Sequence, residues 1–209
     1  MAYPVRRTLF HTTLAILLAL VLAWLPARAG ALRTIDPFPP LEEFVDAVSN
    51  GEERSLRGIY VPGVLAGWIV PQPEAQPWFV SESENTLTHF GLPAQFGSTG
   101  LLAHNTLAGK DFSRLRPGHV ITLAYGDGRT ETFIVIERRR FQALKPESTR
   151  SLFVDLDQGN LLTASQLFLE VYDRPGNVIL QTCIEAEDEP AWGRLFIIAT
   201  PYDGDGKRW

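Results

Sequence analysis

The sequence predicts an all-β domain that closes into an antiparallel barrel or folds as a sandwich. Short apolar runs separated by glycine and proline recur along the chain from Gly58 onward, and such runs are typical of strands and turns. Two of them, residues 119–125 and 130–137, flank the glycine-rich segment 126–129, which predicts a β-hairpin. Few segments have helical spacing, so the helices are expected to be few and short.

The first 29 residues are predicted to be a targeting segment. Arg6 and Arg7 precede an apolar run from Leu14 to Leu25, and the small-residue pattern Ala27-Arg28-Ala29 follows. These are the parts of a signal peptide, while an uncleaved membrane anchor is the alternative because the run can be extended back to Leu9. In either case the rest of the chain is expected outside the membrane, either secreted or anchored at the cell envelope by this segment.

Residues 30–56 are predicted to form a linker that contains one short helix. Apolar residues recur there at helical spacing, at Leu41, Phe44, Val45 and Val48. Pro40 can occupy the first helical position and Gly51 can end the helix. Residues 57–202 are then expected to form the β-rich domain, and 203–209 a polar tail.

Further strands are expected where short apolar runs stand between glycine, proline or polar residues, at 58–61, 67–70, 100–103, 178–183 and 194–200. One helical turn is expected around 112–115, and the long segment 138–176 is expected to carry a helix within 161–172. His89 is placed in a polar loop and His119 at a turn.

The composition excludes several classes of protein. The 209 residues include 19 basic and 24 acidic side chains, a formal charge of −5, which gives no support to a nucleic-acid partner. The single cysteine, Cys183, excludes an intramolecular disulfide and a cysteine-rich zinc site. A lone thiol in an exported protein is either inert in the core or has a chemical role.

Three residues at the ends of predicted strands could carry chemistry together. Cys183 ends one apolar run, His104 ends another, and Arg194 begins the last. A cysteine nucleophile needs a group that handles protons and a group that stabilises an oxyanion, and an arginine offers a fixed fork of donors for the second task. From spacing alone, a structural role is favoured for His104 and Arg194, and an inert cysteine remains the alternative at Cys183.

Taken together, the motifs around these residues resemble those of sortases. Ala103-His104, Leu180-Gln181-Thr182-Cys183 and the run from Arg194 to Thr200 occur in the order and approximate spacing of three sortase motifs. Those motifs are an (A/G)-H strand end, an L-x-T-C strand end and an R-φ-φ-φ-x-A-T strand, with φ apolar. Residues 112–121 are also similar to the family's F-x-x-L-x-x-G-D-x-I stretch, although His119 stands where Asp is common. The resemblance extends over roughly residues 57–201.

The resemblance implies a closed eight-stranded β-barrel that acts as a catalytic domain. In sortases, the cysteine attacks the Thr–Gly amide of a sorting signal such as LPxTG, and an amine on a cell-wall precursor or pilin resolves the thioester. This assigns Cys183 as nucleophile, His104 as general acid or base, and Arg194 as substrate and oxyanion ligand. Thr182 is placed beside the scissile bond, and segment 138–176 is expected to be a specificity loop along the substrate groove.

Other functions remain open from the sequence. One is a hydrolase on the same fold, in which water resolves the thioester. A second is a peptidoglycan L,D-transpeptidase, whose S-H-G-C segment differs from the Leu-Gln-Thr that precedes Cys183. A third is a non-enzymatic envelope-binding β-barrel module with a buried cysteine. No cofactor is expected, and calcium bound at Asp155, Asp157, Gly159 and Asn160 is the alternative.

Overall fold

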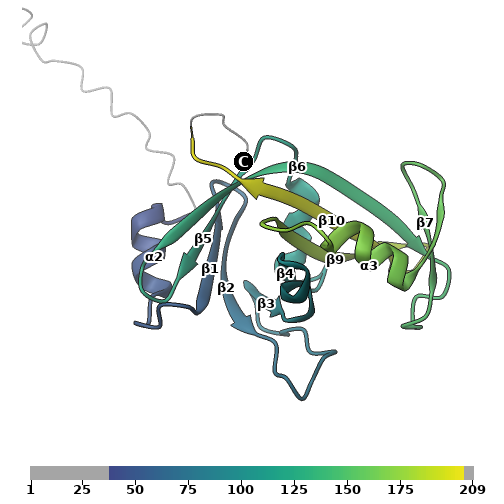
Figure 1. The fold of residues 1–209 in the computed structure, drawn as a ribbon, viewed down its shortest axis with the longest axis horizontal. Coiled ribbons are helices and arrows are strands. Elements are labelled where there is room, and N and C mark those ends of the chain that lie inside the picture. Colours follow the sequence, from purple (N-terminus) through teal and green to yellow (C-terminus); the bar gives the residue numbers. More distant parts are fainter. Residues whose placement is uncertain (1–37, 205–209) are drawn as a thin grey trace, which may run out of the picture. The chain divides into compact units, whose positions relative to one another are not determined.

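The computed structural model describes residues 38–204 (Figure 1). The predicted targeting segment 1–29 and most of the predicted tail 203–209 lie outside these residues. Within 38–204, none of the helices has the length and apolar character needed to cross a membrane.

Eight strands close into a barrel in the order β10-β9-β4-β3-β2-β1-β5-β6, and β6 pairs with β10 to complete the circle (Figure 1). They are β1 (Leu56–Val61), β2 (Leu65–Pro71), β3 (Thr86–Phe90), β4 (Thr99–Leu102), β5 (Val120–Tyr125), β6 (Thr130–Ala143), β9 (Val178–Ala186) and β10 (Glu189–Pro201). The predicted eight-stranded closed barrel is therefore confirmed.

The barrel is mixed, whereas the sequence predicted antiparallel pairing throughout. The β2–β3 and β4–β9 pairs are parallel, and the other pairs around the barrel are antiparallel. Parallel neighbours need a connection longer than a hairpin turn. The segment 72–85 gives that length between β2 and β3, and residues 103–177 separate β4 from β9.

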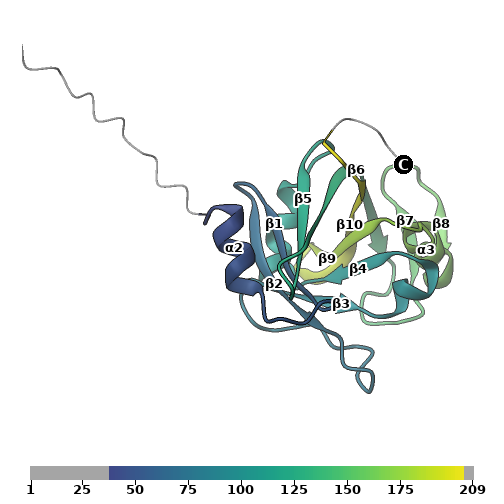
Figure 2. The same cartoon turned by 60° about the vertical axis from the view of Figure 1, so that its left-hand side comes forward.

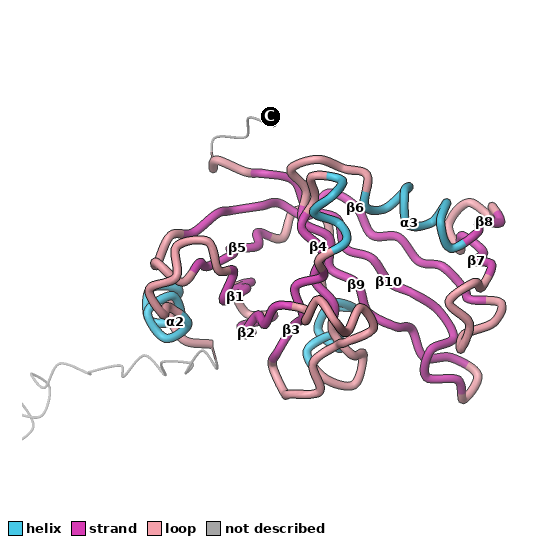
Figure 3. Tube along the Cα trace, turned by 60° about the horizontal axis from the view of Figure 1, so that its bottom comes forward, coloured by secondary structure: helices cyan, strands magenta, loops and turns pink. Residues whose placement is uncertain are grey.

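Strand alternation gives β9 and β10 two apolar faces. Val178, Leu180 and Ile197 point into the barrel core, whereas Ile179 and Ile198 belong to a second core on the outer face. This outer core is covered by helix α3 (Ala164–Tyr172) and by the hairpin of β7 (Leu152–Asp155) and β8 (Leu161–Thr163). Figures 2 and 3 show α3, β7 and β8 grouped on the side of the barrel away from α2.

Helix α3 begins at a capping box. Thr163 Oγ1 accepts a hydrogen bond from the Gln166 backbone N–H at 3.2 Å, and Gln166 Oε1 accepts one from the Thr163 N–H at 2.9 Å. The helix expected within 161–172 is thus confirmed. The rest of segment 138–176 is more ordered than a loop, because β6 continues to Ala143 and is followed by β7 and β8.

Helix α2 (Leu41–Val48) lies at the predicted position. It buries Phe44, Val45 and Val48 against Tyr60 and Ala124 on the outer face of β1 and β5. Gly58 permits this close packing, because a Cβ there would lie 2.9 Å from the Phe44 ring. The helix is therefore packed against the barrel.

The strand β3 was not predicted. His89, which was placed in a polar loop, lies within it and pairs with Leu101 of β4. Thr88 is fully buried in the same strand, and its Oγ1 accepts a hydrogen bond from the Ser81 N–H at 2.8 Å. Burial lowers the pKa of His89 below its ordinary value. Buried threonines in a short strand give a polar sequence that resembles a loop.

Candidate active site

The backbone brings the three predicted residues into one row across neighbouring strands. Arg194 of β10 pairs directly with Cys183 of β9. On the other side of β9, Leu102 of β4 pairs with Gln181 in the parallel ladder. The backbone N–H of the next residue, Ala103, donates a hydrogen bond to the Gln181 carbonyl oxygen at 3.1 Å. Because parallel strands advance together, His104 stands level with Cys183, just past the end of β4. Adjacent strands lie about 4.8 Å apart.

Cys183 is a free and partly exposed cysteine. It is two residues from Gln181 and four from Ile179 along β9, so by strand alternation it shares the outer face with them. An inert cysteine would be expected within the packed core, as Leu180 is on the same strand, with no exposed surface. The position of Cys183 therefore suits a thiol that reacts with an external molecule.

An apolar groove of about 380 Å³ runs along the outer face of the barrel. We call it the outer groove; it is lined by Pro77, Trp78, Phe90, Leu102, Thr149, Phe153, Ala164, Leu167, Phe168, Tyr172, Gln181, Arg194 and Phe196. Strands β4, β9 and β10 contribute its floor, and α3 contributes one wall. The groove is thus lined by residues from the expected specificity segment 138–176 and by the predicted arginine.

Aromatic packing fixes the wall of the outer groove. Tyr172 and Phe168 of α3 lie with ring centroids 4.9 Å apart, and Phe90 and Phe196 make edge contacts with Tyr172 at 5.7 and 6.1 Å. Burial raises the pKa of Tyr172, and its hydroxyl donates to Gln181 Oε1 at 2.7 Å. This hydrogen bond holds Gln181 in the groove floor, two residues before Cys183.

The sequence interpretation missed Gln181 and Tyr172 as groove residues. Strand alternation could have found Gln181, since residues two apart on a strand share a face. Tyr172 had no comparable signal, because its place in the groove depends on how α3 packs against β9 and β10.

Arg194 is held by the backbone of its own strand, β10. Its Nη1 donates to the carbonyl oxygens of Ala191 and Gly193, at 2.8 and 2.9 Å. Among residues 38–204, its guanidinium forms no ion pair with a carboxylate. It therefore brings a fixed positive charge to the outer groove that no acidic side chain within ion-pair distance neutralises.

His104 borders a second cavity, of about 540 Å³, together with the segment Trp78–Ser83. Gln72 holds this segment, because its Nε2 donates to the carbonyl oxygens of Pro77 and Phe79 at 3.0 and 3.1 Å. Trp78 lines both this cavity and the outer groove. The segment therefore connects the surroundings of His104 with those of Arg194.

Thr182 faces a different side of β9. Its side chain is 4% exposed, and its Oγ1 is buried without a hydrogen-bond partner among the described residues. It lines a third cavity, of about 330 Å³, which also reaches Cys183. A substrate contact by Thr182 stays a prediction, as does the meeting of the Cys183, His104 and Arg194 side chains in one groove.

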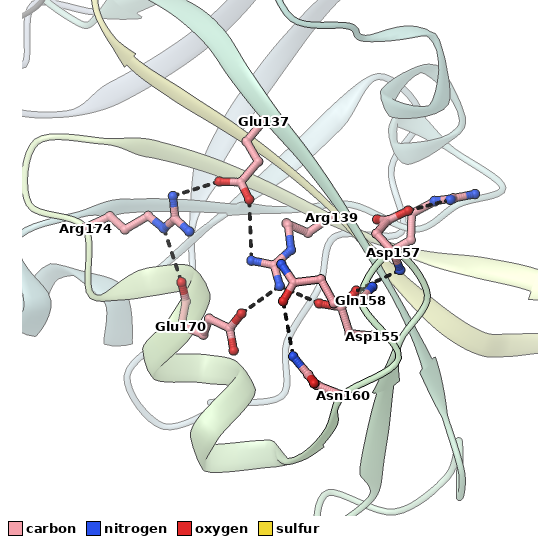
Figure 4. A network of polar contacts seen from close by, with 9 residues as sticks. Glu137, Arg139, Asp155, Asp157, Gln158, Asn160, Glu170 and Arg174 are labelled. Carbon is pink, nitrogen blue, oxygen red and sulfur yellow. Dashed lines mark hydrogen bonds and ion pairs between the residues drawn. The ribbon is translucent and has the colours of Figure 1, made fainter.

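A network of charges attaches α3 and β7 to β6 (Figure 4). Arg139 Nη2 lies 2.6 Å from Asp155 Oδ2 of β7 and 2.6 Å from Glu170 Oε1 of α3. Glu137 contacts Arg139 at 3.4 Å and Arg174 at 2.9 Å. Arg139 and Asp155 are almost fully buried, so the outer groove's wall depends on their pairing.

The acidic turn that resembles a calcium loop has a structural explanation. Asp155 Oδ1 accepts hydrogen bonds from the N–H groups of Asp157 and Gln158, at 2.8 and 3.0 Å, and Oδ2 faces Arg139. Asp157 pairs with Arg140. Within the described part of the chain, no cluster of three His, Cys, Asp or Glu side chains is placed to hold a metal ion.

Comparison with known proteins finds similarity among solved structures only. No protein-family model matches the sequence, and no curated protein matches it. Sortase A of Listeria monocytogenes is 13% identical over 72% of this chain and 89% of its own, with a TM-score of 0.46.

Two further matches come from other sortase classes. Sortase C-1 of Actinomyces oris is 15% identical over 80% of this chain and 83% of its own, with a TM-score of 0.45. The sortase D5 transpeptidase of Clostridium perfringens is 15% identical over 79% and 90%, with a TM-score of 0.42. The solved structures similar to this eight-stranded mixed barrel thus include sortases of classes A, C and D.

Proposed function

We propose that this chain is a cysteine transpeptidase of the sortase type. The observation that carries the proposal is the row formed by His104, Cys183 and Arg194. The sequence's only thiol is partly exposed and lies in direct register with an arginine that has no carboxylate partner among the described residues. It also stands level with a histidine just past the end of the neighbouring strand β4.

The chemistry follows from the residue types in this row. His104 takes the proton of the Cys183 thiol as the sulfur bonds to the carbonyl carbon of a peptide amide. The C–N bond of that amide then breaks, and His104 passes the proton to the departing amine. Arg194 stabilises the negative charge on the carbonyl oxygen during this step. An acceptor amine then attacks the thioester, loses a proton to His104 and restores the thiol.

The outer groove suits a short extended peptide with apolar side chains. Its wall and floor are largely aromatic and aliphatic. Of its polar residues, Gln181 lies two residues before Cys183 on β9, and Arg194 pairs with Cys183 from β10. This chemistry fits a sorting signal of a surface protein as donor, with an amine on a cell-wall precursor or pilin as acceptor. The predicted targeting segment would place the reaction at the cell envelope.

A transfer assay tests this function. The full-length chain is incubated with a library of labelled pentapeptides, with and without an added amine, and products are identified by mass spectrometry. We expect cleavage that depends on Cys183 and a product joined to the amine. His104→Ala should lower the rate by roughly 10²-fold or more, the usual weight of general acid–base catalysis.

Two controls separate the alternatives. His119→Ala changes a histidine outside this row and should retain activity. Cleavage that ends only in the free acid, even with excess amine, would assign the chain as a hydrolase. Equal activity in Cys183→Ala and the unmodified protein would rule out the proposed chemistry.

A further inference from the structure

The third cavity lies across β9 from the outer groove, and we call it the inner pocket. It has a volume of about 330 Å³, and β6, β9, β10 and the 3₁₀ helix at Ala108–Arg114 contribute to it. Because side chains alternate between the two faces of a strand, Thr182 and Leu195 lie on the same face as the barrel-core residues of β9 and β10. The pocket reaches Cys183 at one end.

The inner pocket is rich in positive charge. Arg138 and Arg140 pair in the ladder with Ile197 and Leu195, so they share the inner face, whereas Arg139 between them points toward α3. Lys110 adds a third cation from the 3₁₀ helix, and Glu185 is the one acidic lining residue.

Only one of these cations has an acidic partner. Arg140 pairs with Asp157 at 2.7 Å, and both side chains are about half exposed. Arg138 forms no ion pair within the described chain. Burial and the nearby guanidinium groups of Arg116 and Arg140 lower the pKa of Arg138, despite the opposing effect of Asp157. Arg138 thus lies near two other guanidinium groups and, among the described residues, has no carboxylate within ion-pair distance.

Two buried polar atoms in this pocket also lack partners. Thr182 Oγ1 and Arg138 Nε are both buried and form no hydrogen bond with another described residue. Native proteins rarely leave such groups unsatisfied. A hydroxyl and a guanidinium N–H can both donate to the same acceptor, and an oxyanion provides several acceptor oxygens with the charge that Arg138 lacks.

We infer that the inner pocket is a binding site for a carboxylate or phosphate group, held by Arg138, Arg140, Lys110 and the Thr182 hydroxyl. Arginine presents its donors in a planar fork that matches both anions. An anion at this place satisfies the unpartnered donors and competes with Asp157 for Arg140. Because the pocket reaches Cys183, the bound group lies beside the reactive thiol.

This site also specifies the acceptor, an assignment that rests on the proposed function. The outer groove holds the donor peptide on one side of β9, so the inner pocket approaches the thioester from the other side. The corresponding acceptor is an amine that carries a carboxylate or phosphate a short distance from its nitrogen.

Direct binding tests the site without any turnover. The backbone amides of ¹⁵N-labelled full-length protein are followed by NMR during titration with inorganic phosphate, and separately with acetate, at constant ionic strength. We expect saturable shifts at Thr182 and Leu195. Arg138→Gln should weaken binding about tenfold or more, as loss of a charge-assisted hydrogen bond predicts.

Arg54→Gln is the matched control, because it removes one positive charge from an exposed residue outside the inner pocket. If Arg138→Gln loses its native spectrum, Arg140→Gln replaces it, since Arg140 is half exposed. Saturation by phosphate alone or by acetate alone identifies the preferred anion. Absence of saturation with both anions, or equal weakening by Arg54→Gln and the pocket variant, would overturn the site.

The acceptor assignment has its own readout. Transfer of the peptide that this chain cleaves is measured with O-phosphoethanolamine and with β-alanine as acceptors, and compared with transfer to ethanolamine, which carries no anionic group. We expect the acceptor that carries the preferred anion to react about tenfold faster, with this preference lost in Arg138→Gln. Equal rates for all three amines would contradict the assignment. Binding without any transfer would instead count against the proposed function and leave the anion site standing.

Discussion

Arg194 differs from the other charged residues of the outer face in what holds it. Arg139 is fixed by carboxylates, whereas Arg194 is fixed by two backbone carbonyl oxygens of its own strand. One guanidinium nitrogen makes both contacts, so the fork is oriented while its charge stays uncompensated by an acidic side chain among residues 38–204. Such an arrangement suits the transient negative charge of an oxyanion.

Replacing Arg194 with Lys tests whether the orientation of the guanidinium matters. Arg194→Lys keeps the charge but loses the planar fork, so kcat/KM for peptide cleavage should fall by roughly 10² to 10³, the usual effect of losing an oxyanion donor. Arg54→Lys, at an exposed residue, serves as the control and should be unchanged. Steady-state kinetics measure both. Full activity in Arg194→Lys would show that only charge is needed, and full activity in Arg194→Ala would remove this residue from the mechanism.

At the scale of elements, helix α3 and strand β7 owe their position to a buried charge network. Arg139 is the shared partner, since it reaches β7 through Asp155 and α3 through Glu170 (Figure 4). Removing one member of a buried ion pair leaves the other charge uncompensated, which is more costly than losing an exposed pair. The outer groove should therefore be sensitive to a residue that does not line it.

Replacing Arg139 with Met tests that dependence. The substitution leaves Asp155 buried and unpaired, so we expect the free energy of unfolding to fall by about 3–5 kcal/mol. A milder variant, Glu170→Gln, should retain the fold while raising KM for the peptide more than it lowers kcat, because it loosens α3. Arg140→Met breaks a half-exposed pair and should cost no more than about 1 kcal/mol. Chemical denaturation that shows equal losses for Arg139→Met and Arg140→Met would contradict the network's role.

The same network predicts a dependence on acid. Burial raises the pKa of Asp155, but hydrogen bonds from Arg139 and from the amides of Asp157 and Gln158 outweigh it, and the pKa lies below its ordinary value. A lowered pKa stabilises the fold above the unfolded-state value of about 3.9, and this contribution is lost as pH falls through the folded-state pKa. Unfolding free energies measured from pH 5 downward should therefore fall less steeply in Asp155→Asn. An identical slope in both proteins would exclude Asp155 as a source of the acid sensitivity.

Local patterns predicted many of the elements. The glycine turn at 126–129 predicted the hairpin, and helical spacing predicted α2, because both signals are contained in a few neighbouring residues. The strand β3 was missed because Thr86 and Thr88 are buried but polar. The two parallel pairings were also missed, since they depend on how long connections cross the barrel and leave no mark in either strand alone.

Some of the candidate site residues could be predicted from the sequence, and others could be identified only from the packing of the structure. Cys183, His104 and Arg194 were recognisable because each stands at one end of a short apolar run, within a motif that resembles a sortase motif. In the structure β9 continues past Cys183 to Ala186 and β10 begins before Arg194, at Glu189. Tyr172 and Arg139 became visible only when α3 was packed against the barrel. Arg138 and Arg140 gave no signal in the sequence, and only the register of β6 and β10 places them on the inner face.

At the scale of the whole domain, the two faces of strand β9 border two different cavities. The outer face of β9 adjoins an aromatic groove, and its inner face adjoins a cationic pocket. Cys183 lies near the end of this strand, between the two. In the proposed transfer reaction, two substrates would have to reach one thiol, and each of these two environments would receive one of them.

Trapping the covalent intermediate tests the central claim most directly. The full-length protein is incubated, without an amine, with the intact peptide that it cleaves in the transfer assay. The reaction is quenched in acid, and the protein is examined by intact and tandem mass spectrometry. The account predicts a thioester to Cys183 that carries the amino-terminal part of the peptide and disappears when an amine is added. Cleavage of the peptide without an adduct on Cys183, or with an adduct on another residue, would contradict it.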